Sequence, residues 1–144
     1  MHRFRNILTA VFVARPNRFV VQCLVNGRTV RAYLPNPGRL WELLFPGTRL
    51  YLTKFPPSPE RKLAYLVVAV ERDGMPVMLH THHTNTVAAH LLREHDIPGL
   101  EGAEIVKTEH TIGRSRFDFL LRKDGNDVLL EVKSCTLFNR TLAM

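Results

Sequence analysis

The sequence predicts a two-part α+β chain, with a small β-barrel in residues 1–79 and a helix followed by a β-meander in residues 80–144. Three observations indicate this division. The first part alternates short apolar runs with Gly, Pro and Asn turn signals. The second part starts with a helical apolar stripe before strand-like runs return. The charge also divides, because the first part has twelve Lys and Arg against four Asp and Glu, or +8, and the second has eight against nine, or −1.

The first three strands of the predicted barrel are residues 7–13, 19–25 and 29–34. Arg15-Pro16-Asn17 is the predicted turn between the first two. Asn26-Gly27 joins the second to the third, because these residues favour the positive φ angles of a type I′ hairpin turn. Side chains alternate along the third strand, so one face is core and the other is polar and basic. The predicted core face is Val30, Ala32 and Leu34, and the opposite face is Thr29, Arg31 and Tyr33.

Further short strands complete the predicted barrel. Residues 39–44 are expected to form one helical turn, and the strands 49–55, 63–70 and 76–80 follow. Closure into a barrel would remove the exposed edges of so many short antiparallel strands. An oligonucleotide-binding (OB) barrel is the leading candidate, because aromatic rings and basic side chains together suit nucleic-acid binding. The aromatic residues in this region include Phe19, Tyr33, Trp41, Tyr51 and Tyr65.

The second part begins with a helix predicted to run from Thr84 or Asn85, as the capping residue, to about residue 96. Val87, Leu91 and Leu92 form its apolar stripe. Three strands follow, at residues 104–111, 116–122 and 128–137, and Asp124-Gly125-Asn126-Asp127 is the hairpin turn between the last two.

Composition excludes several classes of protein. The longest apolar run, residues 63–70, is far shorter than the ~18 residues that a membrane span needs, and the N-terminus lacks the apolar core of a signal peptide. Cys23 and Cys135 are too few for a disulfide scaffold or a cysteine-rich zinc site. We therefore expect a cytoplasmic protein in which both cysteines are reduced core thiols.

The excess positive charge favours a polyanionic partner, either DNA or RNA. The candidate contacts in the basic half are Arg18, Arg28, Arg31 and Arg39. The alternative is a solvated basic face that has no partner.

Candidate catalytic residues lie on the last two predicted strands. Glu131 and Lys133 are two residues apart, so in an extended strand they project from one face. Asp118 lies between two phenylalanines on the strand expected to pair with theirs. The carboxylates of Asp118 and Glu131 would then share a face of the sheet, where they repel each other unless a proton or a cation lies between them. Mg²⁺ or Mn²⁺ suits such a site, because these ions bind one or two carboxylates and keep several waters.

This donor set suits metal-assisted phosphodiester hydrolysis. Asp118 and Glu131 would bind the ion, and the Val132 carbonyl is a further candidate ligand. Lys133 would orient or deprotonate the attacking water and offset negative charge in the transition state. Glu109, one strand earlier, is a candidate ligand that would bind the ion directly or support another ligand. The alternative, given equal weight, is that Glu109 is a strand carboxylate that faces solvent. The alternative for the set is an ordinary strand with a surface Glu and Lys. A zinc site at His80 and His82 is disfavoured, because no second ligand pair accompanies them.

The motif Ser115-Arg116-Phe117-Asp118-Phe119-Leu120, followed by Glu131-Val132-Lys133-Ser134, resembles the PD-(D/E)XK nuclease motif of the sugar fermentation stimulation protein A family. Matches in the same order extend over nearly the whole chain. They are residues 16–19, residues 34–40, Asn85, Thr108-Glu109 and Ile112-Gly113.

The resemblance implies an N-terminal OB barrel, a C-terminal restriction-endonuclease-like α/β core, a DNA partner and a transcription-related role. Asn36, inside the matching segment 34–40, joins the four arginines as a candidate nucleic-acid contact. Where the family has Glu on the first helix, this chain has His90, and Thr86 stands where Arg is usual.

The family's nuclease domain continues beyond the Glu-x-Lys strand, so we expect this chain to be a fragment with an incomplete nuclease core. The face of residues 128–137 that a missing helix would cover is then exposed, or buried in an oligomer. Two functions stay open. One is a Mg²⁺-dependent nuclease whose activity needs the complete protein. The other is a non-catalytic DNA-binding module or transcriptional regulator.

Overall fold

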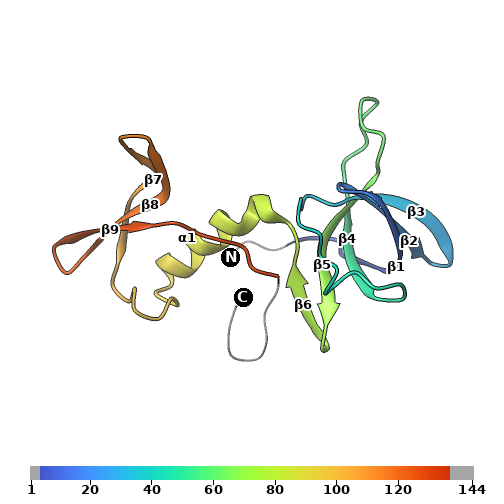
Figure 1. Ribbon diagram of the computed structural model, residues 1–144, viewed down its shortest axis with the longest axis horizontal. Helices are drawn as coiled ribbons and strands as arrows, with labels where there is room; N and C mark the ends of the chain where they lie inside the picture. The colour runs from blue at the N-terminus through green and yellow to red at the C-terminus, as the bar shows by residue number, and fades with distance from the viewer. Residues whose placement is uncertain (1–3, 137–144) are drawn as a thin grey trace. The chain divides into compact units, whose positions relative to one another are not determined.

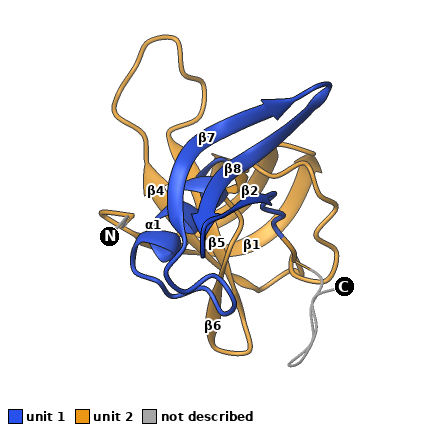
Figure 2. Cartoon of the chain, turned by 90° about the vertical axis from the view of Figure 1, so that its left-hand side faces the viewer, with its two compact units in different colours: residues 1–2, 82–134 blue, residues 3–81, 135–144 orange. Residues whose placement is uncertain are grey.

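The computed structural model describes residues 4–136, which form two compact units (Figures 1 and 2). We call residues 4–81 the barrel unit and residues 82–134 the meander unit. Each unit has its own hydrophobic core. No helix within residues 4–136 is long and apolar enough to cross a membrane.

The barrel unit is a closed barrel of five strands, which confirms the predicted fold class. The strands are β1 (Leu8–Asn17), β2 (Val20–Val25), β3 (Arg28–Tyr33), β4 (Arg49–Lys54) and β5 (Tyr65–Arg72). Their order is β3-β2-β1-β4-β5, and a parallel pairing of β3 with β5 closes the barrel. The last strand of the barrel unit, β6 (Met75–Met78), pairs with β5 and with no other strand of residues 4–136. The loop at residues 55–64 protrudes from the barrel between β4 and β5 (Figure 1).

The β2–β3 hairpin has the predicted turn and the predicted faces. Asn26 and Gly27 both have positive φ, at 49° and 76°, as a type I′ turn requires. Ala32 and Leu34 are fully buried, and Val30 packs against the same core. Alternation along the strand therefore separates an apolar face from a basic one.

The first strand is longer than predicted, because β1 continues through Arg15-Pro16-Asn17 instead of ending in a turn there. The pairing of β1 with β2 has register shifts between Phe12 and Ala14 and again between Ala14 and Asn17. Pro16 therefore lies at an irregularity of the ladder, where the missing N–H of proline is tolerated. A single turn is present after β3, as predicted, and in it Leu43 N and Leu44 N both donate to Leu40 O.

The meander unit comprises α1 (Thr84–Arg93) and a sheet of β7 (Glu104–Ile112), β8 (Ser115–Lys123) and β9 (Asn126–Leu130) in that order. A short 3₁₀ helix, Thr81–His83, precedes α1. The sheet packs its apolar face against α1, with a core of Ala88, Ala89, Leu92, Ala103, Phe119 and Leu121.

Two local predictions for the second half are wrong. His83, not Thr84 or Asn85, is the N-cap residue of α1, and it makes no side-chain capping bond. The last strand ends at Leu130, because Val132 N donates to a side chain instead of continuing the ladder. Residue 137, the predicted strand end, lies outside the described residues.

The two cysteines differ in environment. Cys23 is fully buried in the barrel core, and burial raises the pKa of its thiol to about 11. Cys135 is exposed, so the prediction of a core thiol is wrong for this residue. The predicted strand that would have buried it ends five residues earlier, at Leu130.

Candidate metal centre and nucleic-acid interface

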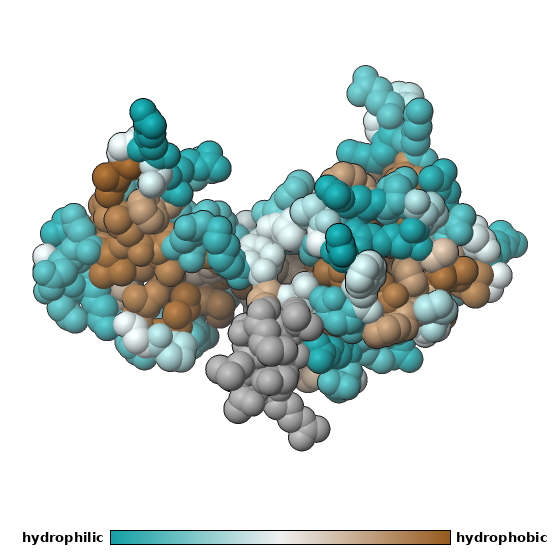
Figure 3. All heavy atoms as spheres, in the orientation of Figure 1, coloured by the Kyte–Doolittle hydropathy of each residue, from teal (hydrophilic) through white to brown (hydrophobic). Residues whose placement is uncertain are grey.

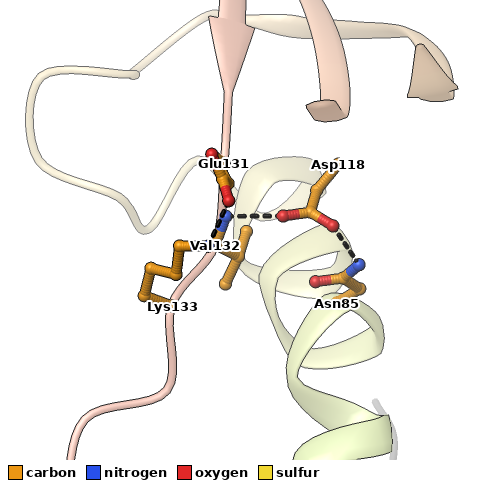
Figure 4. Close-up of polar contacts among 5 residues, drawn as sticks. All are labelled: Asn85, Asp118, Glu131, Val132 and Lys133. Atoms are coloured by element: carbon orange, nitrogen blue, oxygen red, sulfur yellow. Dashed lines mark hydrogen bonds and ion pairs between the residues drawn. The ribbon is translucent and has the colours of Figure 1, made fainter. Parts of the chain in front are cut away.

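The Asp118 carboxylate connects three segments of the meander unit (Figure 4). Asp118 is half-buried near the middle of β8, and its neighbour Phe119 points into the core. Asn85 Nδ2, on the first turn of α1, donates to Asp118 Oδ1 at 2.7 Å. Val132 N, just beyond β9, donates to Asp118 Oδ2 at 2.7 Å. Asp118 therefore holds the segment with Glu131 and Lys133 against the sheet.

These contacts keep Asp118 ionised. The hydrogen bond from Val132 N lowers the pKa of the Asp118 carboxyl most, and the Asn85 bond and the charges of Lys133 and Arg116 lower it further, against an opposing effect of burial. At neutral pH the site therefore holds a fixed negative charge.

Glu131 and Lys133 form an ion pair through Glu131 Oε1 and Lys133 Nζ. Both side chains are exposed, and they meet across an irregular segment instead of the predicted strand. The hydrogen bond and negative charge of Glu131 raise the pKa of Lys133. Lys133 is therefore a positive charge beside Asp118 rather than a proton acceptor at neutral pH.

A pocket of about 380 Å³ opens beside Asp118, between α1 and the sheet. Glu109 of β7 lines it and is exposed, with a left-handed backbone at φ 52°. Arg93 of α1 adds a positive charge to the lining. Asp118 and Glu109 thus line one pocket, while Val132 N contacts Asp118 through Oδ2.

The carboxylates do not converge on one point. Among residues 4–136, no group of three or more His, Cys, Asp and Glu side chains lies close enough to hold one metal ion. His90, at the position where the resembling family has Glu, lies 3.9 Å from Glu94 through Nδ1 and Oε1. It is not one of the residues that line the pocket beside Asp118.

Sequence reasoning missed the role of Asn85, which was predicted to cap the helix. No local pattern pairs Asn85 with Asp118, because the two residues are 33 positions apart and on different elements. The match of Asn85 to the resembling family was the one available signal. No sequence signal pointed to Arg93, which lines the same pocket as Asn85.

The five predicted nucleic-acid contacts on the barrel unit lie in three different environments. Arg18 and Arg39 line one pocket of about 330 Å³. Arg28 and Arg31 are exposed on β3, away from that pocket's lining. Asn36 is buried, where Nδ2 donates to Leu79 O at 3.2 Å and Oδ1 accepts from Gly38 N at 2.9 Å. Its side chain therefore organises the loop instead of lying on the surface.

Arg15 holds the two loops that carry Arg18 and Arg39. Its Nη1 donates to Gly38 O and Arg39 O, and its Nη2 donates to Arg18 O at 2.6 Å and Asn36 O at 3.0 Å. The sequence placed Arg15 in a simple turn and gave it no role. One side chain with several N–H donors can satisfy many loop carbonyls at once.

A second basic and aromatic region surrounds the 55–64 loop. Tyr33, Phe55, Arg61 and Lys62 line a pocket of about 560 Å³, and the Arg61 guanidinium lies 4.1 Å from the Phe55 ring centroid. Phe19 and Tyr33 lie with ring centroids 6.4 Å apart. The adjacent pair Arg61-Lys62 was the sequence signal for this region, but the proline-rich loop around it obscured that signal.

The lowered pKa of Asp118 predicts that acid weakens the meander unit. A carboxyl whose pKa is lower in the folded than in the unfolded chain stabilises the fold above the unfolded value, near 3.8, and this stabilisation is lost as pH falls through the folded value. Asn85→Ala removes one donor, so we expect the pKa of Asp118 to move up towards its ordinary value. Carboxyl NMR titration of Asp118 in both proteins tests this. A parent pKa at or above the ordinary value would contradict the assigned hydrogen bonds.

Comparison with known proteins agrees with both units. Residues 13–79 match the family model of the SfsA N-terminal OB domain, and residues 82–144 match that of the sugar fermentation stimulation protein RE domain. Sugar fermentation stimulation protein homologs from Methanothermobacter thermautotrophicus and Moorella thermoacetica are each 39% identical over 96% of this chain, covering 58% and 60% of those proteins.

A solved structure is also similar. The structure of Pyrococcus furiosus SfsA in complex with Ca²⁺ matches 99% of this chain and 60% of that chain, with 28% identity and a TM-score of 0.78. The chain thus spans about 60% of the length of these relatives. Since the two family models together cover nearly all of it, this chain belongs to the sugar fermentation stimulation protein (SfsA) family.

Proposed function

We propose that the chain binds DNA, or RNA, through its barrel unit. The observation that carries the proposal is the grouping of exposed cations and aromatic rings around the loops of a closed OB-type barrel. Arg39 lies over Trp41, Arg61 lies over Phe55, and Arg31 lies on the outer face of β3. The β2–β3 face and the adjoining loops are where OB barrels bind oligonucleotides, with bases on rings and phosphates on Lys and Arg.

A salt series tests this proposal. Fluorescence anisotropy of labelled single- and double-stranded oligonucleotides would be measured from low to physiological salt. We expect the association constant to fall steeply as salt rises, because binding releases condensed counterions. Binding that is absent at low salt, or independent of salt, would contradict the proposal.

A second candidate function, metal-dependent phosphodiester hydrolysis, is favoured by the contact between Asp118 and Val132 N. This contact puts an ionised carboxylate next to the Glu131-Val132-Lys133 segment. Asp118, Glu131 and the Val132 carbonyl are hard oxygen donors, and Mg²⁺ or Mn²⁺ commonly takes one or two carboxylates and several waters. Each Asp118 oxygen accepts one hydrogen bond and keeps further lone pairs for an ion. The donor chemistry therefore fits such an ion, and Glu109 could add an oxygen from across the pocket.

A bound ion at this site would polarise a phosphodiester and lower the pKa of a coordinated water. The chain's own residues supply the rest. Asn85 and Val132 N fix the orientation of the Asp118 carboxylate. Lys133 keeps its proton and offers positive charge to a phosphate. The Ca²⁺ named for the Pyrococcus furiosus SfsA structure is also a hard, oxygen-seeking ion.

The non-catalytic alternative also has an observation in its favour. Both Asp118 oxygens accept N–H donors, and Glu131 is paired with Lys133. A site in this form could hold a structural ion, or none. Calorimetric titration with Mg²⁺ and Mn²⁺ and a cleavage assay with and without chelator separate the alternatives. Metal binding together with chelator-sensitive cleavage supports the nuclease. If the protein encoded by the longest open reading frame binds DNA without cleaving it, the binding module is supported.

Oligomerisation through the meander unit stays a prediction. Val106, Ile112 and Leu129 are exposed on this unit, and Figure 3 shows hydrophobic side chains gathered on the face of it that is turned to the viewer.

A further inference from the structure

The pocket between the β1–β2 turn and the β3–β4 loop has an apolar floor and a basic rim. Phe12, which is almost fully buried, and Leu44 contribute the floor. Arg15, Arg18 and Arg39 contribute the cations, and no Asp or Glu is among the residues that line it. The pocket at the 55–64 loop differs, because Glu60 lies in its lining. The pocket with three arginines is therefore the more positively charged of the two.

The arginine charges of this pocket are not neutralised. The side chains of Arg18 and Arg39 make no ion pair with any residue in the range 4–136. Burial lowers the pKa of Arg15 most, and the like charge of Arg18 lowers it further, because two neighbouring guanidinium groups repel each other. Arg15 Nε is also buried without a hydrogen-bond partner among the described residues. An anion bound here would relieve the repulsion.

An exposed aromatic ring lies beside these cations. Trp41 is 70% exposed, lines the same pocket, and has the Arg39 guanidinium 5.0 Å from its ring centroid. An indole ring this exposed has a free face, and a nucleobase stacks well on such a face. A nucleotide carries both a phosphate and a base, so arginines that can bind phosphate next to an indole that can stack on a base suit one nucleotide.

We propose that this pocket is a nucleotide subsite that binds one phosphate between Arg18 and Arg39 and stacks its base on Trp41. The inference rests on the proposed nucleic-acid binding and specifies its substrate class. In a duplex each base is covered on both faces by its neighbours, so only a single strand offers a base to the ring. The subsite therefore selects single-stranded over double-stranded nucleic acid.

Arg15 acts as a positioning residue for this subsite. Its guanidinium bonds the carbonyls of Arg18 and Arg39 and so sets the spacing of the two arginines that face the phosphate. Asn36 supports the same loop from the core through Leu79 O and Gly38 N. The subsite is thus held by side chains before any ligand arrives.

Trp41 is the only tryptophan of the chain, so its fluorescence reports on this pocket alone. A thymidine oligonucleotide of about 10 residues, within the site sizes of single OB folds, would be titrated into the protein, and a duplex of equal length would be titrated in parallel. We expect strong quenching by the single strand and little by the duplex at equal concentration. Trp41→Leu should weaken single-strand binding by about 10-fold, as measured by anisotropy.

Matched controls come from the same unit. Phe45→Leu changes an exposed ring of the same loop that is outside the pocket lining, and it should leave affinity unchanged. Arg39→Gln should weaken binding, whereas Arg49→Gln, at an arginine paired with Glu71, should not. Circular dichroism of each variant checks folding.

The outcomes separate this inference from the proposed function. If single strands bind but Trp41 fluorescence and the affinity of Trp41→Leu are unchanged, the subsite is overturned and nucleic-acid binding stands. If the duplex quenches Trp41 as strongly as the single strand, selection of single strands is overturned. If no oligonucleotide binds at low salt, both proposals fail, and Trp41 with its arginines is then better explained as a contact for an acidic protein.

Discussion

Replacing Asp118 by alanine is expected to lower metal-dependent phosphodiester cleavage on the order of 1000-fold or more, as removal of one member of a catalytic unit does. The change removes a carboxylate ligand and frees Val132 N, which otherwise holds the Glu131-Val132-Lys133 segment beside β8. Calorimetry should show that Mg²⁺ and Mn²⁺ affinity falls with the rate. The assay uses the protein encoded by the longest open reading frame that includes this chain.

Two further variants distinguish lost chemistry from lost structure. Asp118→Asn keeps an oxygen that can accept from Val132 N but removes the charge and one of the two acceptor oxygens. We therefore expect it to be less stable than the parent, but folded, and to cleave poorly. Asp127→Ala removes an exposed carboxylate of the same sheet that pairs with Arg122, and its cleavage should match the parent's. Cleavage that persists in chelator, or an Asp118→Ala protein as active as the parent, would rule out the metal nuclease.

Reversing the charge of Arg18, Arg28, Arg31 and Arg39 together is expected to weaken oligonucleotide binding by about 100-fold or more near physiological salt. Each cation that neutralises a phosphate contributes about 0.7 to the slope of log K against log salt for a single strand. Loss of four such contacts should therefore flatten the slope by about three. All four side chains are exposed and the barrel core does not include them, so the fold should survive.

The matched control reverses Lys107 and Arg114, which are exposed on and beside β7 of the meander unit. Binding and salt slope should then stay near the parent values, because the proposed phosphate contacts lie on the barrel. An unchanged slope in the four-arginine variant would mean that other groups bind the nucleic acid. The control changes the net charge by half as much, so a loss of log affinity about half that of the four-arginine variant would mean that net charge, not the barrel surface, drives binding.

Local patterns were sufficient for the main elements of this fold. Asn26-Gly27 specified a hairpin turn because few residues tolerate positive φ, and alternation on β3 specified which side chains are buried. Many short strands in a small basic segment predicted barrel closure. The charge division and the spacing of Asp118 from Glu131 and Lys133 led to the candidate site. These features depend on interactions between near neighbours or on periodicity.

The tertiary structure alone decided how those residues are used. Asn85 contacts Asp118 instead of capping α1, and Val132 N leaves the strand ladder for the same carboxylate. The side chain of Asn36 is buried and donates to Leu79 O. Arg15, predicted in a turn, lies in β1, and its guanidinium donates to carbonyls of two loops. In each case a polar group forms its hydrogen bond with a partner that is distant in the sequence. Burial makes an unsatisfied donor or acceptor costly, so the packed surroundings, not the local sequence, determine which partner each group takes.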